Sequence, residues 1–129
     1  MDLFTYSGIN INSSFQRSTR IDNELTSDFL KNYIFHDTSR KVLDQISNSI
    51  TNTNQSAFTL TGAYGTGKSS LALFLKALIS KENKIKKLAE NISGYNPRHN
   101  FYKTFSKNNW FILNLIGSKV DPLQSISYQ

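Results

Sequence analysis

A glycine-rich octapeptide near the middle of the chain has the residue types and the spacing of a phosphate-binding loop. Residues 62–69 read GAYGTGKS, which matches G-x-x-x-x-G-K-[ST] at every fixed position. A loop that wraps a polyphosphate must turn its backbone N–H groups inward, and glycine adopts the required conformations at low cost. The positive end of a following helix then faces the bound anion. The octapeptide therefore predicts that the chain binds a nucleoside triphosphate.

The polar residues of this loop have distinct expected roles. Lys68 is the predicted catalytic residue, since its ammonium group would reach the β and γ phosphates. The Ser69 hydroxyl is the predicted metal ligand, for Mg²⁺, and Ser70 is expected to bind the α phosphate. The predicted cofactor-binding residues are Gly62, Ala63, Tyr64, Gly65, Thr66, Gly67, Lys68, Ser69 and Ser70.

The segments on either side of the loop have patterns that would position it. Residues 57–61 form a compact β-prone run, which predicts a buried strand ending at the loop. Apolar residues recur at helical spacing over 71–79, which predicts a helix starting at the loop. Another helix is expected over 38–50, with Thr38 or Ser39 as its N-cap, and a short helix fits residues 27–33.

The second half of the chain predicts one more helix and one more strand. Apolar residues over 85–92 indicate a helix that Gly94 would end. A loop is expected from Asn96 to Asn109, followed by a buried strand over 110–116, which reads WFILNLI. A further helix is expected to begin at Asp121 as its N-cap, with Pro122 in the first helical position.

The octapeptide with these flanks resembles the Walker A motif of P-loop NTPases, and the helix over 38–50 looks like the first helix of AAA+-type ATPases. Residues 14–77 are also similar to the N-terminal part of large prokaryotic ATP-binding proteins. The resemblance implies that the cofactors are ATP and Mg²⁺ and that residues 15–21 and 33–34 border the adenine. It also implies a parent ATPase that can be oligomeric.

The fold class expected from these patterns is α/β, a partial P-loop NTPase fold with a parallel sheet core of two strands flanked by helices. Residues 1–55 would form an N-terminal lead-in with its helix, and residues 56–129 an incomplete core. A hydrolase of this kind needs a strand that ends in an acidic residue, but the strand over 111–116 runs into Gly117, and Asp121 comes five residues after the strand ends. We therefore expect the N-terminal piece of a larger ATPase, truncated before its Walker B strand and inactive alone.

Two alternatives remain for the nucleotide site. The chain can be a module that holds nucleotide without turnover. It can also bind GTP, because SKVD at residues 118–121 is similar to the N/T-K-x-D sequence that reads guanine in GTPases. Serine replaces the usual first residue, however, and a D-x-x-G sequence between the loop and this motif is missing. GTP is therefore the weaker alternative.

Charge distribution raises the separate question of a nucleic-acid partner. Residues 76–107 contain eight basic and two acidic side chains, so this segment carries a net charge of +6, equal to that of the whole chain. A solvated lysine-rich helix is the preferred interpretation, and nucleic-acid binding is the alternative. In the second case Tyr95, Phe101, Tyr102 and Phe105 could stack on bases, although we expect them in the core.

Composition excludes several other classes of protein. The sequence has no cysteine, and its two histidines, His36 and His99, lack a ligand pattern, so a structural metal site is not expected. No stretch of about 20 apolar residues is present, and residues 1–10 lack the pattern of a signal peptide. The expected location is therefore the cytoplasm, with no membrane partner.

Overall fold

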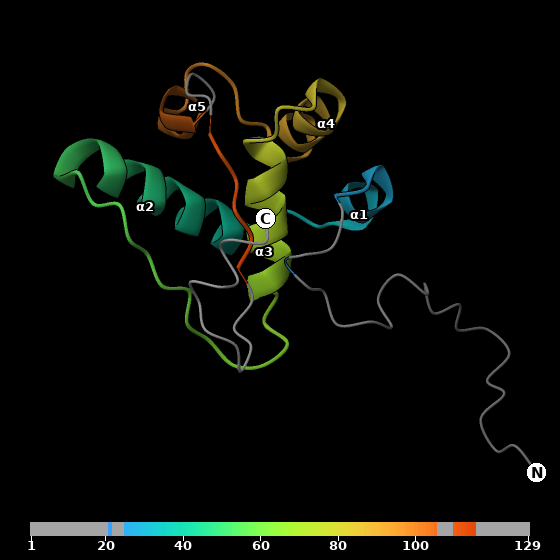
Figure 1. The fold of residues 1–129 in the computed structure, drawn as a ribbon, viewed down its shortest axis with the longest axis horizontal. Coiled ribbons are helices and arrows are strands. Elements are labelled where there is room, and N and C mark those ends of the chain that lie inside the picture. Colours follow the sequence, from blue (N-terminus) through green and yellow to red (C-terminus); the bar gives the residue numbers. More distant parts are fainter. Residues whose placement is uncertain (1–20, 22–24, 106–109, 116–129) are drawn as a thin grey trace, which may run out of the picture.

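Helices and the segments that join them make up the described part of the protein. A computed structural model describes residue 21, residues 25–105 and residues 110–115, and within these residues it contains helices but no strand. Figure 1 shows α3 upright in the centre, with α2 and α5 on one side and α1 and α4 on the other. The helices are α1 Ser27–Asn32, α2 Asp37–Thr53, α3 Lys68–Leu78, α4 Asn83–Ser93 and α5 Asn100–Phe105.

The first four helices confirm the helical predictions, and their ends have local causes. The Thr26 hydroxyl accepts a hydrogen bond from the Phe29 N–H at 3.2 Å, which caps α1. Gly94 ends α4 in the left-handed conformation, with φ 69°, as the sequence predicts. The predicted N-cap of α2 was wrong, because the helix follows His36 and begins before Thr38.

The sequence pattern missed α5, which lies within the predicted loop between residues 96 and 109. Phe101 and Phe105 are one helical turn apart and both are buried, with 2% and 5% of their surface exposed. Such a short helix is marginal by itself, so these two rings stabilise it through their packing. Helix α5 packs against α2, whereas α4 packs against both α3 and α1.

The expected α/β fold with a parallel sheet is wrong for the described residues. Residues 57–61 and 110–115 are not paired as strands, and Phe58 and Phe111 are 37% and 83% exposed. Parallel strands need backbone hydrogen bonds along the length of both strands, and a sheet of only two strands has little stability of its own. The apolar helix faces are buried against one another instead. Ile116 and the predicted helix from Asp121 lie outside the described residues.

One aromatic and aliphatic cluster joins all the helices. Phe74 of α3 is fully buried at its centre, where its ring stacks on Tyr33 at 4.5 Å and on Phe35 at 5.0 Å between centroids. The buried members of the cluster are Leu30, Leu43, Leu71, Phe74, Ala77, Leu78, Ile85, Ala89, Tyr95, Phe101 and Phe105. Because Phe74 is on α3, the core fixes the helix whose first residue is Lys68.

A polar junction, formed by Arg40, Asp44, Ser93 and Tyr95, ties α2 to the end of α4. The Arg40 guanidinium donates to the Ser93 carbonyl and lies 5.2 Å from the centroids of both the Phe35 and Tyr95 rings. The Tyr95 hydroxyl donates to Asp44 Oδ1 at 2.8 Å. The junction thus satisfies a carbonyl of the last turn of α4, which has no partner within the helix.

Candidate functional site

The glycine-rich loop leads directly into α3, as a phosphate-binding loop requires. Gly67 is the N-cap of α3 with φ 80°, and Gly65 has φ 81°. A Cβ atom added at either glycine would meet no atom within 4 Å. Glycine is therefore favoured by the backbone conformation at these two positions and not by lack of space.

Lys68 folds back over the loop. Its ammonium group donates to the Gly62 carbonyl at 2.9 Å and to the Ala63 carbonyl at 2.7 Å. It also approaches Thr66 Oγ1 at 3.4 Å, and that hydroxyl donates to the Ala63 carbonyl at 2.9 Å. These partners are all neutral. Among the described residues, the positive charge of Lys68 therefore has no carboxylate partner that would compete with a bound anion.

The first turn of α3 offers further donors beside this ammonium group. The Leu71 N–H donates to the Gly67 carbonyl at 2.9 Å and begins the helical hydrogen bonding. The N–H groups of residues 68–70 precede it and have no acceptor within the helix. The Ser69 and Ser70 side chains are partly buried. Backbone donors, the helix dipole and the Lys68 charge therefore act together on this end of α3.

A cleft of about 470 Å³ lies between the loop and the first turns of α2. The loop side contributes both carbonyl and ammonium groups, and Val42 and Leu71 make part of the wall apolar. This mixture suits a ligand with a charged end and a flat, less polar end. The lining residues are His36, Thr38, Ser39, Val42, Leu60, Thr61, Gly62, Thr66, Gly67, Lys68 and Leu71.

The structure brings only part of the predicted nucleotide site to this cleft. Gly62, Thr66, Gly67 and Lys68 line it, while Ser69 and Ser70 follow in the first turn of α3. The side chain of Tyr64 is 95% exposed and is not part of the lining. Ala63 and Gly65 do not line it either.

The residues expected to border the adenine lie elsewhere. Tyr33 stacks on Phe74 in the core, and Ile34 is 70% exposed, and neither lines the cleft. Residues 15–20 lie outside the described part of the chain. His36, Thr38 and Ser39 take the place beside the loop, and sequence reasoning missed them as site residues. Their position at the start of the helix before the loop was the available signal.

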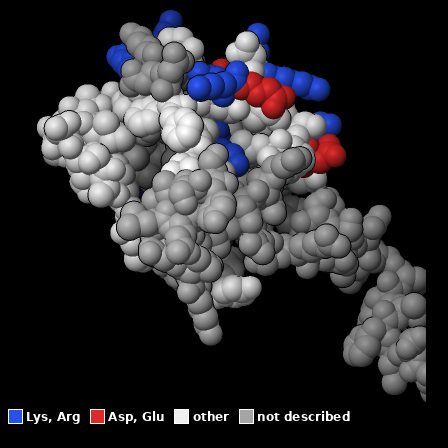
Figure 2. Space-filling model, in the orientation of Figure 1, with Lys and Arg blue, Asp and Glu red and all other residues white. Residues whose placement is uncertain are grey.

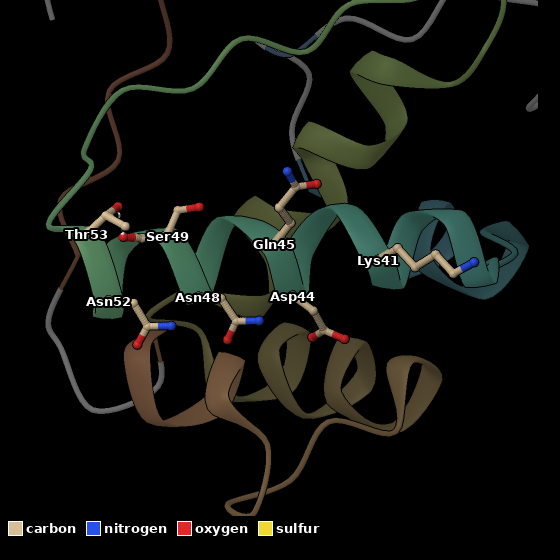
Figure 3. A pocket seen from close by; sticks show the side chains of 7 residues that line it. All are labelled: Lys41, Asp44, Gln45, Asn48, Ser49, Asn52 and Thr53. Atoms are coloured by element: carbon tan, nitrogen blue, oxygen red, sulfur yellow. Dashed lines mark hydrogen bonds between the residues drawn. The ribbon is translucent and has the colours of Figure 1, made fainter.

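A second hollow, along α2, offers weaker chemistry. It has a volume of about 430 Å³, and Figure 3 shows that all seven of its labelled side chains come from this one helix. Two of them already have structural partners. Asp44 accepts a hydrogen bond from the Tyr95 hydroxyl, and Asn48 Oδ1 accepts one from Asn100 Nδ2 at 2.6 Å. The hollow is therefore an open groove beside a helix–helix contact, and we do not treat it as a site.

The described residues offer neither a cluster of metal-ligating side chains nor a membrane-spanning helix. Over residues 25–105 and 110–115, no group of three or more histidine, aspartate or glutamate side chains comes together in a way that could hold a metal ion. In the same ranges, every helix is too short or too polar to cross a membrane. The SKVD stretch at residues 118–121 falls outside them, so its proposed guanine contact has no structural description.

Comparison with known proteins does not assign the chain to a family. No family model matches the sequence, and no curated protein or solved structure is significantly similar to it. The features of the protein that point to a function are therefore the loop, the cleft beside it and the charge of the surrounding surface.

Proposed function

We propose that the chain binds ATP together with Mg²⁺ through the loop at residues 62–70, as a P-loop module of an AAA+-like ATPase. The main support is the Lys68 ammonium group, which is held over the loop by neutral acceptors next to the free N–H groups of α3. The triphosphate replaces those carbonyls as the partner of Lys68. The nucleoside then lies in the cleft against Val42 and Leu71.

Mg²⁺ fits this proposal through few protein ligands. Mg²⁺ commonly keeps several waters and binds through substrate phosphates plus one or two protein oxygens. Ser69, at the second position of α3, supplies one such oxygen beside the phosphates. The ion bound there neutralises phosphate charge, while Lys68 and the loop amides orient the triphosphate.

The test is the thermal stability of the protein with and without Mg-ATP. A ligand that binds only the native state at 100 times its Kd stabilises it by about 2.7 kcal/mol. We expect Lys68→Ala to abolish most of the resulting rise in Tm. Lys76→Ala is the matched control, because it removes the same charge from the last turn of the same helix. Equal shifts in wild type and Lys68→Ala would contradict the proposal.

The choice of ligands separates the phosphate contacts from the base contacts. Inorganic triphosphate with Mg²⁺ should retain part of the stabilisation, since it has the anionic groups that the loop binds, whereas adenosine should give little. GTP should stabilise less than ATP. A larger shift with GTP would contradict the assignment of ATP and support the GTP alternative.

A further inference from the structure

Basic side chains from three helices gather at the end of the molecule opposite the loop. Lys and Arg side chains lie along the upper edge in Figure 2, where Figure 1 places α4 and α5 and the C-terminal end of α3. The acidic residues in the same stretch are Glu82 and Glu90. We call the surface of this part of the chain the basic face. The basic residues that α3, α4, α5 and the segments between them contribute are Lys76, Lys81, Lys84, Lys86, Lys87, Arg98 and Lys103.

The amphipathic pattern of the helices causes this gathering. In α4, Ile85 and Ala89 are buried, whereas Lys84 and Lys87 are exposed one turn apart. In α5, burial of the two phenylalanines leaves Lys103 exposed on the outer side. The helices therefore turn their cations outward because their apolar residues face the common core.

The cations of the basic face have no acidic partners among the described residues. The ion pair that the described residues do form joins Lys31 to Asp28 at 3.5 Å. Both residues belong to α1 and lie away from the basic face. None of the seven side chains makes an ion pair or a hydrogen bond with another described residue. An external polyanion can therefore bind these cations without breaking a salt bridge between two described residues.

The aromatic rings near the basic face are largely buried and do not offer a surface on which bases could stack. Tyr95 stacks on Phe101 at 4.5 Å, and Phe101 lies 4.7 Å from Phe105, measured between ring centroids. All three rings are buried, which confirms the interpretation of them as core residues. Tyr102 is partly buried. Proteins that hold single strands use exposed aromatic rings to stack on bases, and this face has no fully exposed ring among the described residues.

A membrane surface is also a poor fit. Peripheral helices that bind lipid carry large apolar side chains next to their basic residues. Within residues 25–105 and 110–115, the exposed large apolar side chains lie on other segments, before α2, around the loop and after α5: Ile34, Phe58, Leu60, Tyr64, Phe111, Leu113 and Leu115. The basic face is therefore suited to phosphates alone.

We infer that the basic face binds the phosphate backbone of double-stranded DNA without sequence preference. Duplex DNA presents about one negative charge per 1.7 Å of axis, a density that several clustered lysines can neutralise together. Contacts to phosphates carry no direct sequence information. This activity is separate from nucleotide binding, since it uses other residues at the other end of α3.

The experiment is fluorescence anisotropy with a labelled 20-base-pair duplex of arbitrary sequence, measured from 50 to 200 mM NaCl. If about four phosphates are contacted, the slope of log K against log salt should be about −3.6, so affinity falls on the order of 100-fold over this range. Lys84→Glu/Lys87→Glu should weaken binding at 50 mM at least tenfold. A second sequence should bind with the same affinity within about twofold.

The matched control is Lys31→Glu/Lys41→Glu, which makes the same change in net charge on α1 and α2. It should weaken binding by less than about threefold, and circular dichroism should show that both double variants stay helical. Equal losses of duplex affinity in the two double variants would show that only net charge matters, and they would overturn the proposal. Absence of binding at 50 mM would overturn it too.

Other ligands identify the kind of polyanion. Tighter binding of single-stranded oligo-dT than of the duplex, or stronger binding of vesicles rich in phosphatidylserine, would overturn the assignment to a duplex. Lys68→Ala should bind the duplex like the wild type. This last measurement keeps the outcome independent of the proposed nucleotide site.

Discussion

Gly67 is the residue on which the geometry of the loop most directly depends. It has a left-handed conformation at the N-terminal end of α3, and a side chain there is strained even though space for it exists. The sequence motif predicts this residue because the loop chemistry requires it. The motif does not contain His36 or Ser39, whose places beside the loop depend on how α2 packs against it.

We expect Gly67→Ala to lower the free energy of unfolding by about 1–2 kcal/mol and to reduce the Tm shift caused by Mg-ATP, since the strained N-cap displaces the loop. Gly94→Ala is the control. Gly94 has φ 69° at the end of α4, so the strain is similar, but it lies far along the chain from the loop. Thermal unfolding with and without nucleotide should show similar stability losses and a reduced ligand shift only for Gly67→Ala.

Tyr95 should make stability depend on pH above 10. Burial raises the pKa of Tyr95 above its usual value of 10.0, and the hydrogen bond and negative charge of Asp44 raise it further, whereas Arg40 lowers it. A pKa raised by folding stabilises the native state at pH values below the unfolded pKa, and that stability is lost as the pH rises above it. Burial shifts the pKa of Tyr33 in the same direction.

Urea unfolding between pH 8 and 11 tests this expectation. The free energy of unfolding should fall above pH 10, and Tyr95→Phe should lessen the slope by up to about 1.4 kcal/mol per pH unit, the value for one proton. At pH 7, Tyr95→Phe should also lower the free energy of unfolding by about 1 kcal/mol, because it removes the hydrogen bond to Asp44. An unaltered slope in Tyr95→Phe would show that another group causes it.

Hydrolysis of ATP by the 129-residue chain should be no faster than in the Lys68→Ala variant. P-loop enzymes use a carboxylate to complete the metal shell and a positioned residue to orient water, and the residues that line the cleft include no carboxylate. Phosphate release with saturating Mg-ATP is the measurement. A Lys68-dependent turnover on the order of one per second would contradict this prediction.

At the scale of elements, the three longest helices were predictable from the sequence, whereas the two expected strands were wrong for the described residues and the short helix α5 was missed. The helices α2, α3 and α4 are 17, 11 and 11 residues long, and each repeats its apolar residues often enough to show a helical period. The apolar runs at residues 57–61 and 110–116 are too short to show any period. The loop motif that follows the first run favoured a strand there, but strand formation depends on a partner that local sequence does not specify.

The polar junction between α2 and α4 gives an element-scale prediction. Arg40→Ala should lower the free energy of unfolding by about 2 kcal/mol, because it removes a charged hydrogen bond to the Ser93 carbonyl and two ring contacts. Arg40→Lys should keep only part of the stability that Arg40→Ala loses, since an ammonium group lacks the planar surface that stacks on rings. Urea unfolding measures both. The neighbouring exposed Lys41→Ala should change stability by less than about 0.5 kcal/mol, and an equal loss there would contradict this role for the junction.

At the scale of the whole molecule, the excess of basic residues could be predicted from the sequence. Their arrangement on the surface could not. Counting residues places the excess charge in 76–107, but it cannot show that Lys and Arg side chains gather along the edge of the molecule where α4, α5 and the end of α3 lie. The core also could not be foreseen in full, because Tyr33, Phe35 and Tyr95 enter it from segments outside the helices or at their ends. Such contacts depend on the packing of elements distant in the sequence.

The length of α3 has a consequence for how the two proposed ligands would influence each other. Its 11 residues span about 16 Å, and electrostatic interactions at physiological ionic strength are screened over about 8 Å. Mg-ATP and duplex DNA should therefore bind with nearly additive free energies, and saturation with one should change the Kd of the other by less than about twofold. Such a molecule would act as a bivalent adaptor, holding two polyanions at a fixed separation without heterotropic linkage between them.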